Sequence, residues 1–307
     1  MSRIALLFKA TPQFEDDNYL RFGKYLSDSH DVSLIPVDSL QLQDNQVCGE
    51  HLHWHSEFSL GTLVPEADIE PIDQDLLWVL SLGERRSFLD KYQLLYALSK
   101  RTRIINSLDA LMHLKSKYYL TTRPGLFPQP ETHASRNASD LARVINSKGG
   151  KWIVKPPAGS LGRDVFLVSP SDTNLNSILE HLCGMENTDY TMIQRYVPEI
   201  EQGEKRVILA GGRIIDQYKR LHTSGHRTNV SQGSLTEHCE LTPEEREYCE
   251  DLAQHLLTEG VQFSGIDLAW PWLIEINVVN PGGIVTLNKV TGADRTGEVL
   301  DAVLENF

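Results

Sequence analysis

The sequence predicts an α/β protein of three parts, and three observations support this prediction. The chain has 307 residues, and hydrophobic cores stop growing beyond about 250–300 residues, so we expect several subdomains. Short apolar runs alternate with amphipathic segments in the first third, as in parallel βαβ units. Later apolar runs are joined by short turns, which is typical of antiparallel sheet. We therefore expect an N-terminal open parallel sheet, a small central module and a C-terminal antiparallel-rich part.

The N-terminal part is predicted from the order of its apolar runs. The expected strands lie at residues 4–8, 32–37, 76–82 and 104–106. Helical periodicity separates them at about 17–27 and 88–100. A further helix after Ala110 carries Lys115 and Lys117, and a proline-rich linker at 124–130 follows it. Residues 41–73 show no clear period, so the sequence makes no prediction there.

The central and C-terminal parts follow from the same patterns. A helix at 137–147 ends at Gly149-Gly150, and two short strands at 152–154 and 165–168 flank a glycine-containing loop. Further strands are expected at 192–197, 206–210, 213–218, 266–268 and 273–278. Gly211-Gly212 forms a hairpin turn between two of them. A long helix is predicted after Thr242, because Pro243 suits the first helical position and Glu244 and Glu245 suit the first turn.

The charge of the chain excludes some classes of partner. It carries 29 Lys and Arg against 42 Asp and Glu, a formal charge of −13, with 40% hydrophobic residues. Nucleic acid and anionic membrane surfaces both need a positive field, so we expect neither as a partner. An anionic ligand would need a local cluster of basic residues.

The cysteines and the N-terminus indicate a reduced, cytoplasmic protein. The four cysteines have no CxxC spacing, which disfavours a zinc site or a disulfide framework; they are Cys48, Cys183, Cys239 and Cys249. The apolar run Ile4 to Phe8 is too short for a signal-peptide core. No stretch approaches the roughly 18 apolar residues of a membrane span.

Two carboxylates and an amide are predicted to converge on one hairpin. If the strands around Pro271 pair, Asp267 lies opposite Glu275, and Asn277 shares the face of Glu275. The other face is then apolar, with Ile266, Leu268, Ile274, Ile276 and Val278. Oxygen ligands on neighbouring strands suit a hard cation such as Mg²⁺. The same pattern also fits the solvated face of an ordinary hairpin.

A glycine loop and scattered cations are candidates for an anion site. The loop from Pro157 to Gly162 would let backbone N–H groups approach a phosphate, with Lys155 as a point charge. It lacks the ending of a Walker A loop, and a glycine-rich hairpin turn explains it equally well. Basic residues that could converge on an anion are Lys117, Lys155, Arg206, Arg220 and Arg227.

Three alternating histidines, His51, His53 and His55, would share one face of a strand. No acidic or cysteine partner lies at ligand spacing, so the sequence does not favour a metal site there. No GxSxG motif is present, and no cysteine motif marks a nucleophile.

Taken together, these segments resemble the ATP-grasp superfamily, and most closely the bacterial glutathione synthetase family. The resemblance covers about residue 104 to the C-terminus, and its motifs occur in the family's order. They are Ile104-Ile-Asn106 with Lys117, Ile153 to Gly162, Met192 to Ile200, Gly203 to Val207, Arg227-Thr-Asn229, Gly265-Ile-Asp267 and Glu275-Ile-Asn277. The family fold implies an N-terminal domain at 1–115, a central lid subdomain at 116–190 and a C-terminal subdomain at 191–307.

The resemblance also implies roles for individual residues. Nucleotide binding would fall to Lys117, Lys155, the flap residues Gly159, Ser160 and Gly162, and the adenine-side run Gln194, Arg195, Tyr196 and Val197. Asp267, Glu275 and Asn277 would hold Mg²⁺, or Mn²⁺ in its place, and Arg206, Arg220 and Asn229 would lie at the reaction centre. Arg86, Arg227 and the turn Pro281-Gly282-Gly283 would hold the substrate.

The activity implied by the resemblance is ATP-dependent ligation of a small carboxylate and an amine through an acyl phosphate. γ-Glutamylcysteine and glycine are the first substrates to expect, and a homo-oligomer is the expected assembly. The family's Arg-Lys-Asp-Pro-Pro-Phe-Asp-like motif is replaced here by Ser81-Leu-Gly-Glu-Arg-Arg-Ser-Phe-Leu-Asp90. A ligase with another acyl or amine substrate, or an ATP-binding module without catalysis, therefore stays open.

Overall fold

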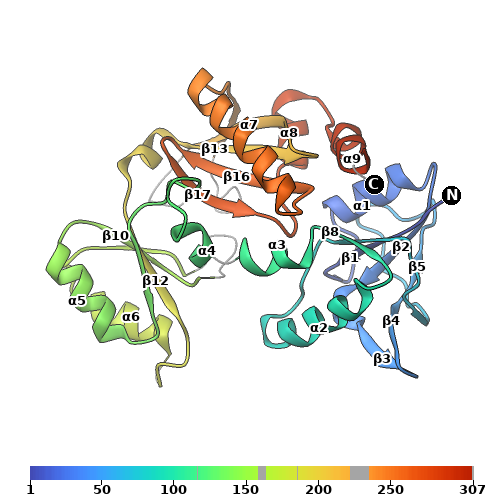
Figure 1. Ribbon diagram of the computed structural model, residues 1–307, viewed down its shortest axis with the longest axis horizontal. Helices are drawn as coiled ribbons and strands as arrows, with labels where there is room; N and C mark the ends of the chain where they lie inside the picture. Colours follow the sequence, from blue (N-terminus) through green and yellow to red (C-terminus); the bar gives the residue numbers. More distant parts are fainter. Residues whose placement is uncertain (116, 158–163, 185, 222–234, 306–307) are drawn as a thin grey trace.

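The computed structural model shows the predicted α/β architecture in three parts. It describes residues 1–115, 117–157, 164–184, 186–221 and 235–305. Figure 1 shows the N-terminal domain on the right with both chain ends beside it, the C-terminal sheet with its helices above the centre, and a smaller lobe on the left with α5 (Ala138–Lys148) and α6 (Leu175–Cys183). Within the described ranges, no helix is both long enough and apolar enough to cross a membrane.

The N-terminal sheet is parallel at its centre, as predicted. Its strand order is β5-β2-β1-β7-β8, with only β5 antiparallel to its neighbour. The strands are β1 (Arg3–Phe8), β2 (Asp31–Pro36), β5 (Leu52–His53), β7 (Leu76–Val79) and β8 (Arg103–Ile105). Helices α1 (Asn18–Leu26) and α2 (Phe88–Leu98) contribute to different cores. Ile4 and Leu6 of β1 share a core with α1, whereas Ala5 and Leu7 share one with α2, so both faces of the sheet are buried.

Residues 41–73, which show no clear period in the sequence, contain a small antiparallel sheet. Its order is β3-β4-β6, formed by β3 (Gln41–Gln43), β4 (Gln46–Glu50) and β6 (Ile69–Pro71), after the 3₁₀ turn η1 (Val37–Ser39). These strands have three to five residues and are partly exposed. Runs this short carry too few residues to show a period of two.

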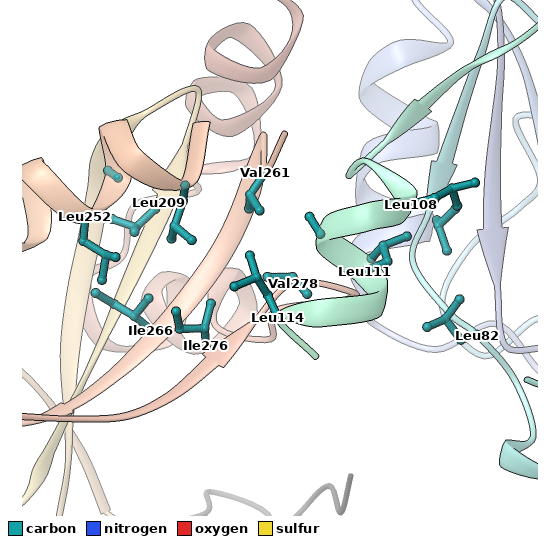
Figure 2. Packing of buried hydrophobic residues seen from close by; sticks show 14 of the residues in the cluster. Leu82, Leu108, Leu111, Leu114, Leu209, Leu252, Val261, Ile266, Ile276 and Val278 are labelled. Carbon is teal, nitrogen blue, oxygen red and sulfur yellow. The ribbon is translucent and has the colours of Figure 1, made fainter. Parts of the chain in front are cut away.

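Helix α3 (Leu108–His113) connects the N-terminal and C-terminal parts through a shared core. Figure 2 shows Leu108 and Leu111 on α3, and Leu114 just after it, between Leu82 of the N-terminal domain and Val278 of the C-terminal sheet. Helix α4 (Lys117–Thr121) follows directly. The predicted single helix is therefore two short helices, and Lys117 opens the second.

The central part has its own antiparallel sheet and its own core. The sheet order is β11-β10-β12-β9, and two helices pack on it. The elements are β9 (Thr132–Ser135), α5 (Ala138–Lys148), β10 (Trp152–Lys155), β11 (Phe166–Val168), α6 (Leu175–Cys183) and β12 (Thr191–Arg195). The predicted domain limits stay a prediction, although the pairing of β12 with β9 and β10 favours a limit after residue 195 rather than 190.

The C-terminal sheet is antiparallel throughout, with the order β15-β14-β13-β16-β17. Its strands are β13 (Glu204–Ala210), β14 (Arg213–Leu221), β15 (Leu235–His238), β16 (Phe263–Ala269) and β17 (Trp272–Asn277), preceded by η3 (Pro198–Gln202). The predicted turn joins β13 to β14, with φ of 55° at Gly211 and 78° at Gly212, values that suit glycine. Helices α7 (Pro243–Thr258), α8 (Ile284–Thr291) and α9 (Thr296–Leu304) complete this part.

Candidate active site

The β16–β17 hairpin has the predicted register at the two carboxylates. Asp267 pairs with Glu275, and Gly265 pairs with Asn277. The Asn277 amide Nδ2 donates to Asp267 Oδ2 at 3.3 Å. The three polar side chains are therefore neighbours, as the alternation along the strands required.

The apolar side of the hairpin differs from the prediction at one residue. The register shifts after Asp267, so that Leu268 pairs with Leu273 and Ile274 becomes an extra residue in β17. Leu273 is fully buried in the core, while Ile274 is only half-buried. The prediction of Ile274 in the core is therefore wrong, because a β-bulge changes the alternation that places every second residue inward.

Two arginines enclose Asp267. The Arg206 guanidinium donates from Nε to Asp267 Oδ1 at 2.5 Å and from Nη2 to Oδ2 at 2.8 Å. Arg220 Nη2 donates to the same Oδ1 and also pairs with Glu204 Oε1 at 2.7 Å. Burial acts to raise the pKa of Asp267, but the two guanidinium groups outweigh it and hold this pKa below its usual range. Asp267 is thus a carboxylate in the folded protein.

The register explains why these charged residues meet. Arg206 of β13 lies opposite Asp267 of β16, and Glu204 of β13 lies opposite Arg220 of β14. Residues two apart on a strand share a face, so one face of the sheet collects all four side chains. The Nε of Arg220 is buried and has no hydrogen-bond partner within the described ranges.

Two lysines from other parts of the fold reach the same face. Lys117, the first residue of α4, donates to Glu275 Oε1 at 2.6 Å. Lys155, the last residue of β10, donates to Gln194 Oε1 at 2.8 Å. Burial and the nearby charge of Lys117 together lower the pKa of Lys155 to about 8, with burial as the larger cause. Four of the five cations singled out in the sequence therefore gather at one place, between the central and C-terminal sheets.

The adenine-side run divides between two faces of β12. Gln194 is buried, and its amide donates to Gln129 Oε1 at 3.2 Å and Thr132 Oγ1 at 3.0 Å. Arg195 points the other way: it donates to the Gly149 carbonyl at 2.6 Å and lies over the Trp152 ring at 4.0 Å. Successive strand residues alternate in this manner, so the Arg195 side chain lies on the face opposite Gln194. Beyond β12, the Tyr196 hydroxyl donates to Glu201 at 2.8 Å, and Val197 is buried.

The Asn280–Gly283 turn joins the site to the N-terminal domain. Arg206 Nη1 donates to the Gly282 carbonyl at 2.7 Å. Asn18, at the start of α1, donates to Asn280 Oδ1 at 2.6 Å and to the Pro281 carbonyl at 3.2 Å. Gly283 has φ of 146° and a Cβ there would lie 2.7 Å from Ile208, so this position requires glycine.

The segment 81–90 lies near Lys115 and Tyr118, which flank Lys117 in the chain. It contains the 3₁₀ turn η2 (Arg85–Ser87), and both Arg85 and Arg86 are exposed. Burial lowers the pKa of Lys115, and the charge of Arg85 adds to this effect. Lys115 also lies 5.3 Å above the Phe88 ring. Arg85 is therefore near Lys115, and the substrate-binding role of Arg86 stays a prediction.

Several predicted residues lie outside the part of the chain that the structure describes. These are Gly159, Ser160, Gly162, Arg227 and Asn229. Their roles stay predictions.

Sequence reasoning missed some residues of the site. Glu204, the buried partner of Arg220, lies within the motif Gly203 to Val207, but only the strand pairing shows what it contacts. Gln129 and Asp17 were also missed; Asp17 accepts from Asn280 Nδ2 at 2.9 Å across a long sequence separation. A run of polar residues at the start of α1 was the only local signal for this contact.

The three hairpin donors fit a hard cation in their chemistry. Asp267, Glu275 and Asn277 offer two carboxylates and an amide oxygen, the ligand types that Mg²⁺ prefers. Asp267 is held by two guanidinium groups, so it must share or release one of them to bind a cation. Glu275 is more accessible, with 34% of its side chain exposed.

The thiols offer no activated nucleophile. The four cysteines are unpaired, and three of them are buried. Burial raises the pKa of Cys239 to about 11 and that of Cys249 to about 12, so both stay protonated at neutral pH.

The fold is that of ATP-grasp proteins. The crystal structure of D-cycloserine synthetase DcsG superposes with a TM-score of 0.71 at 14% identity, covering 99% of both chains. A RimK domain ATP-grasp protein from Sphaerobacter thermophilus superposes with a TM-score of 0.67 at 19% identity, covering 99% of this chain and 100% of that one. At such identities the likeness concerns the fold alone.

Sequence comparison identifies the family. Residues 117–292 match the prokaryotic glutathione synthetase ATP-grasp domain, which is more than half of the chain. Glutathione synthetase of Synechococcus elongatus is 30% identical over 209 residues, covering 67% of this chain and 64% of that protein. Glutathione synthetase of Bradyrhizobium diazoefficiens is 29% identical over 307 residues, covering 98% and 92%. The chain thus spans about two thirds of the length of the cyanobacterial relative. It belongs to the prokaryotic glutathione synthetase ATP-grasp family.

Proposed function

We propose that this chain is an ATP-dependent carboxylate–amine ligase, with γ-glutamylcysteine and glycine as its first-choice substrates. The observation that carries the proposal is the gathering of four cations and three carboxylates on one face between the central and C-terminal sheets. The cations are Lys117, Lys155, Arg206 and Arg220, and the carboxylates are Glu204, Asp267 and Glu275. A chain of net charge −13 thus has a local excess of positive charge, as a polyphosphate requires.

The proposed reaction needs no protein nucleophile. A substrate carboxylate oxygen attacks the γ-phosphorus of ATP, the bond to ADP breaks, and an acyl phosphate forms. An amine then attacks the acyl carbon, the C–O bond to phosphate breaks, and the amine proton leaves with phosphate or water. Positioning and charge neutralisation are the tasks of the protein in such phosphoryl transfers.

The basic residues are assigned to the transferred phosphate and its developing charge. We assign Lys117 and Lys155 to the nucleotide phosphates, and Arg206 and Arg220 to the reaction centre. One well-placed donor on developing charge is worth about 3–4 kcal/mol, so loss of one should reduce turnover roughly 10²–10³-fold. Asp267, Glu275 and Asn277 would hold Mg²⁺, which when bound neutralises phosphate charge. The flap residues, Asn229 and Arg227 keep the roles that the family implies.

An acyl substrate other than γ-glutamylcysteine is the second candidate, and one observation favours it. Segment 81–90 lacks the family motif and instead brings Arg85 near Lys115, two residues before Lys117 in the chain. We also propose a cytoplasmic location and a homo-oligomeric state. Light scattering of the purified protein tests the latter.

The first experiment measures ADP release and product mass with MgATP, γ-glutamylcysteine and glycine. A product of glutathione mass supports the proposal in full. ADP and product with another acyl and amine pair would assign a divergent ligase and direct attention to residues 81–90. Tight MgATP binding with no product from any pair would contradict ligase activity.

The variant that tests the metal site is Glu275→Gln, because Glu275 is the more exposed of the two hairpin carboxylates. This variant should stay folded and lose ligation. Full activity in folded Glu275→Gln would refute the assignment of the metal site.

A further inference from the structure

Three side chains with metal-binding chemistry lie together in the N-terminal domain, away from the candidate active site. His51, His53 and Glu70 each present one ligand atom, and these atoms all lie within 4.8 Å of one another. His51 links β4 to β5, His53 lies in β5, and Glu70 lies in β6. The sequence shows no acidic partner at ligand spacing from the histidines, but the small antiparallel sheet brings Glu70 to them.

His51 is the feature that calls for an explanation. Only 4% of the residue is exposed, and both ring nitrogens are buried without a hydrogen-bond partner within the described ranges. Buried polar atoms of this kind are rare, and an unseen ion is one accepted reason for them. The backbone N–H of His51 donates to the Asp68 carbonyl at 3.0 Å, which places His51 next to the start of β6.

His53 is oriented as a metal-binding histidine would be. Its Nδ1 lies 3.3 Å from Ser33 Oγ, and its Nε2 lies 3.3 Å from Glu70 Oε1. When Nδ1–H donates to the serine hydroxyl, the lone pair of Nε2 faces the carboxylate. Metal-bound histidines commonly donate their other ring N–H to an oxygen in this way. A cation between Nε2 and the carboxylate would satisfy both groups.

We propose that His51, His53 and Glu70 bind a divalent transition metal ion, with Zn²⁺ as the best fit. Two imidazoles and one carboxylate match the ligand preference of Zn²⁺, whereas Mg²⁺ prefers oxygen ligands alone. The side chains of His53 and Glu70 are 59% and 45% exposed, so they can rotate toward the buried His51 and leave a fourth position for water.

The bound ion would join two sheets. β5 belongs to the N-terminal parallel sheet, and β6 belongs to the small sheet β3-β4-β6. Between them lies a long connection with little regular structure at residues 54–68. The ion would therefore close this connection and stabilise the segment around it.

The test is a Zn²⁺ titration of the untagged full-length protein after treatment with a chelator, in buffer containing Mg²⁺ to occupy oxygen-only sites. The wild type should bind one Zn²⁺ in competition with a chromophoric chelator. His53→Ala and Glu70→Gln change exposed side chains, and each should lower the affinity at least about 100-fold, more than an indirect contact would. Ser33→Ala should lower it about 10- to 100-fold, the range for residues that orient a ligand.

The matched control is His55→Ala. His55 lies two residues from His53 but outside the cluster, with its Nδ1 3.7 Å from Glu57. This variant should bind Zn²⁺ as the wild type does. Absence of Zn²⁺ binding in the wild type, or equal affinity in His53→Ala, would overturn the proposal. Strong near-ultraviolet thiolate bands with Co²⁺ would also overturn it, because they would place the ion on cysteines.

Discussion

Lys155 is half-buried, and its proposed role in nucleotide binding offers a reason for its poor solvation. Its ammonium donates to Gln194 at 2.8 Å, and burial lowers its pKa to about 8. Such a group costs folding free energy when charged, unless an anion joins it. Its contribution is therefore expected in ligand binding.

Lys155→Met should accordingly lose most of kcat/KM while keeping or gaining thermal stability. Activity assays and thermal unfolding of the same preparation check both effects. Lys151→Met is the control, because Lys151 is an exposed lysine directly before β10. An unfolded Lys155→Met protein would show a structural role instead.

The pH dependence of nucleotide binding follows from the same residue. The phosphates of a bound nucleotide favour the charged lysine, so they raise its pKa above the value of about 8 in the free protein. Between these two pKa values binding takes up a proton, and the Kd for MgATP should rise with pH above about 8. Calorimetric titration across pH 7 to 9.5 checks this. Lys155→Met should bind more weakly but lose this part of the slope; an unchanged slope would exclude Lys155 as its source.

The two hairpin carboxylates should differ in what their loss does to stability. Asp267 is buried between Arg206 and Arg220, so Asp267→Asn leaves two buried guanidinium groups without their shared anion. Removing one partner of a buried ion pair lowers the free energy of unfolding by about 3–5 kcal/mol. Glu275→Gln should lower it by less, because a third of the Glu275 side chain is exposed. Urea denaturation of both variants distinguishes them, and equal losses would contradict the assigned burial.

At the scale of elements, α7 shows that local sequence can specify a helix start. The Thr242 hydroxyl accepts from the Glu245 N–H at 3.2 Å, and the Glu245 carboxylate accepts from the Thr242 N–H at 2.8 Å. This capping box was absent from the sequence interpretation, but its residues stand next to Pro243, which was used to predict the helix start.

Thr242→Ala should lower the free energy of unfolding by about 1 kcal/mol, because one helix N–H loses its acceptor. Urea denaturation measures the change. Thr258→Ala, an exposed threonine at the other end of α7, is the control and should have a much smaller effect. A larger loss in the control would show that the cap is not the source.

The β16–β17 hairpin shows which contacts can be predicted from local sequence and which cannot. Alternation and the position of Pro271 predicted the Asp267–Glu275 pair correctly, because both depend on residues a few positions apart. The bulge at Ile274 was not predictable, since nothing in the local pattern encodes an extra residue. Contacts between distant strands, such as Arg220 with Glu204, required the order of the sheet.

At the scale of the whole molecule, the N-terminal and C-terminal parts share hydrophobic cores, whereas the central part has its own. Two of them combine residues of the N-terminal and C-terminal parts, such as Leu111 with Ile266 and Phe22 with Phe263. The third contains residues of the central part alone, from Leu141 to Ile193. The central part is therefore expected to open as a separate cooperative unit.

Amide hydrogen exchange should show this division. Strands β10 and β12 should exchange faster than β1 and β16 in the free protein, and MgATP should slow exchange in the central part because the proposed nucleotide site includes Lys155. Exchange measured by mass spectrometry with and without MgATP checks both points. Equal protection of all four strands in the free protein would contradict a separate unit.

Arg206 contacts two groups that belong to different segments of the chain. One guanidinium holds the Asp267 carboxylate and the Gly282 carbonyl, and the turn around Gly282 is anchored by Asn18 of the N-terminal domain. A ligand that displaces Asp267 would change the hydrogen bond between Arg206 and the turn. A ligand at the turn would likewise change the pairing of Arg206 with Asp267. Linkage requires such an influence to be reciprocal: each ligand changes the affinity of the other by the same factor. If the proposed metal site and the turn each bind a ligand, Arg206 is the side chain through which the two would be linked.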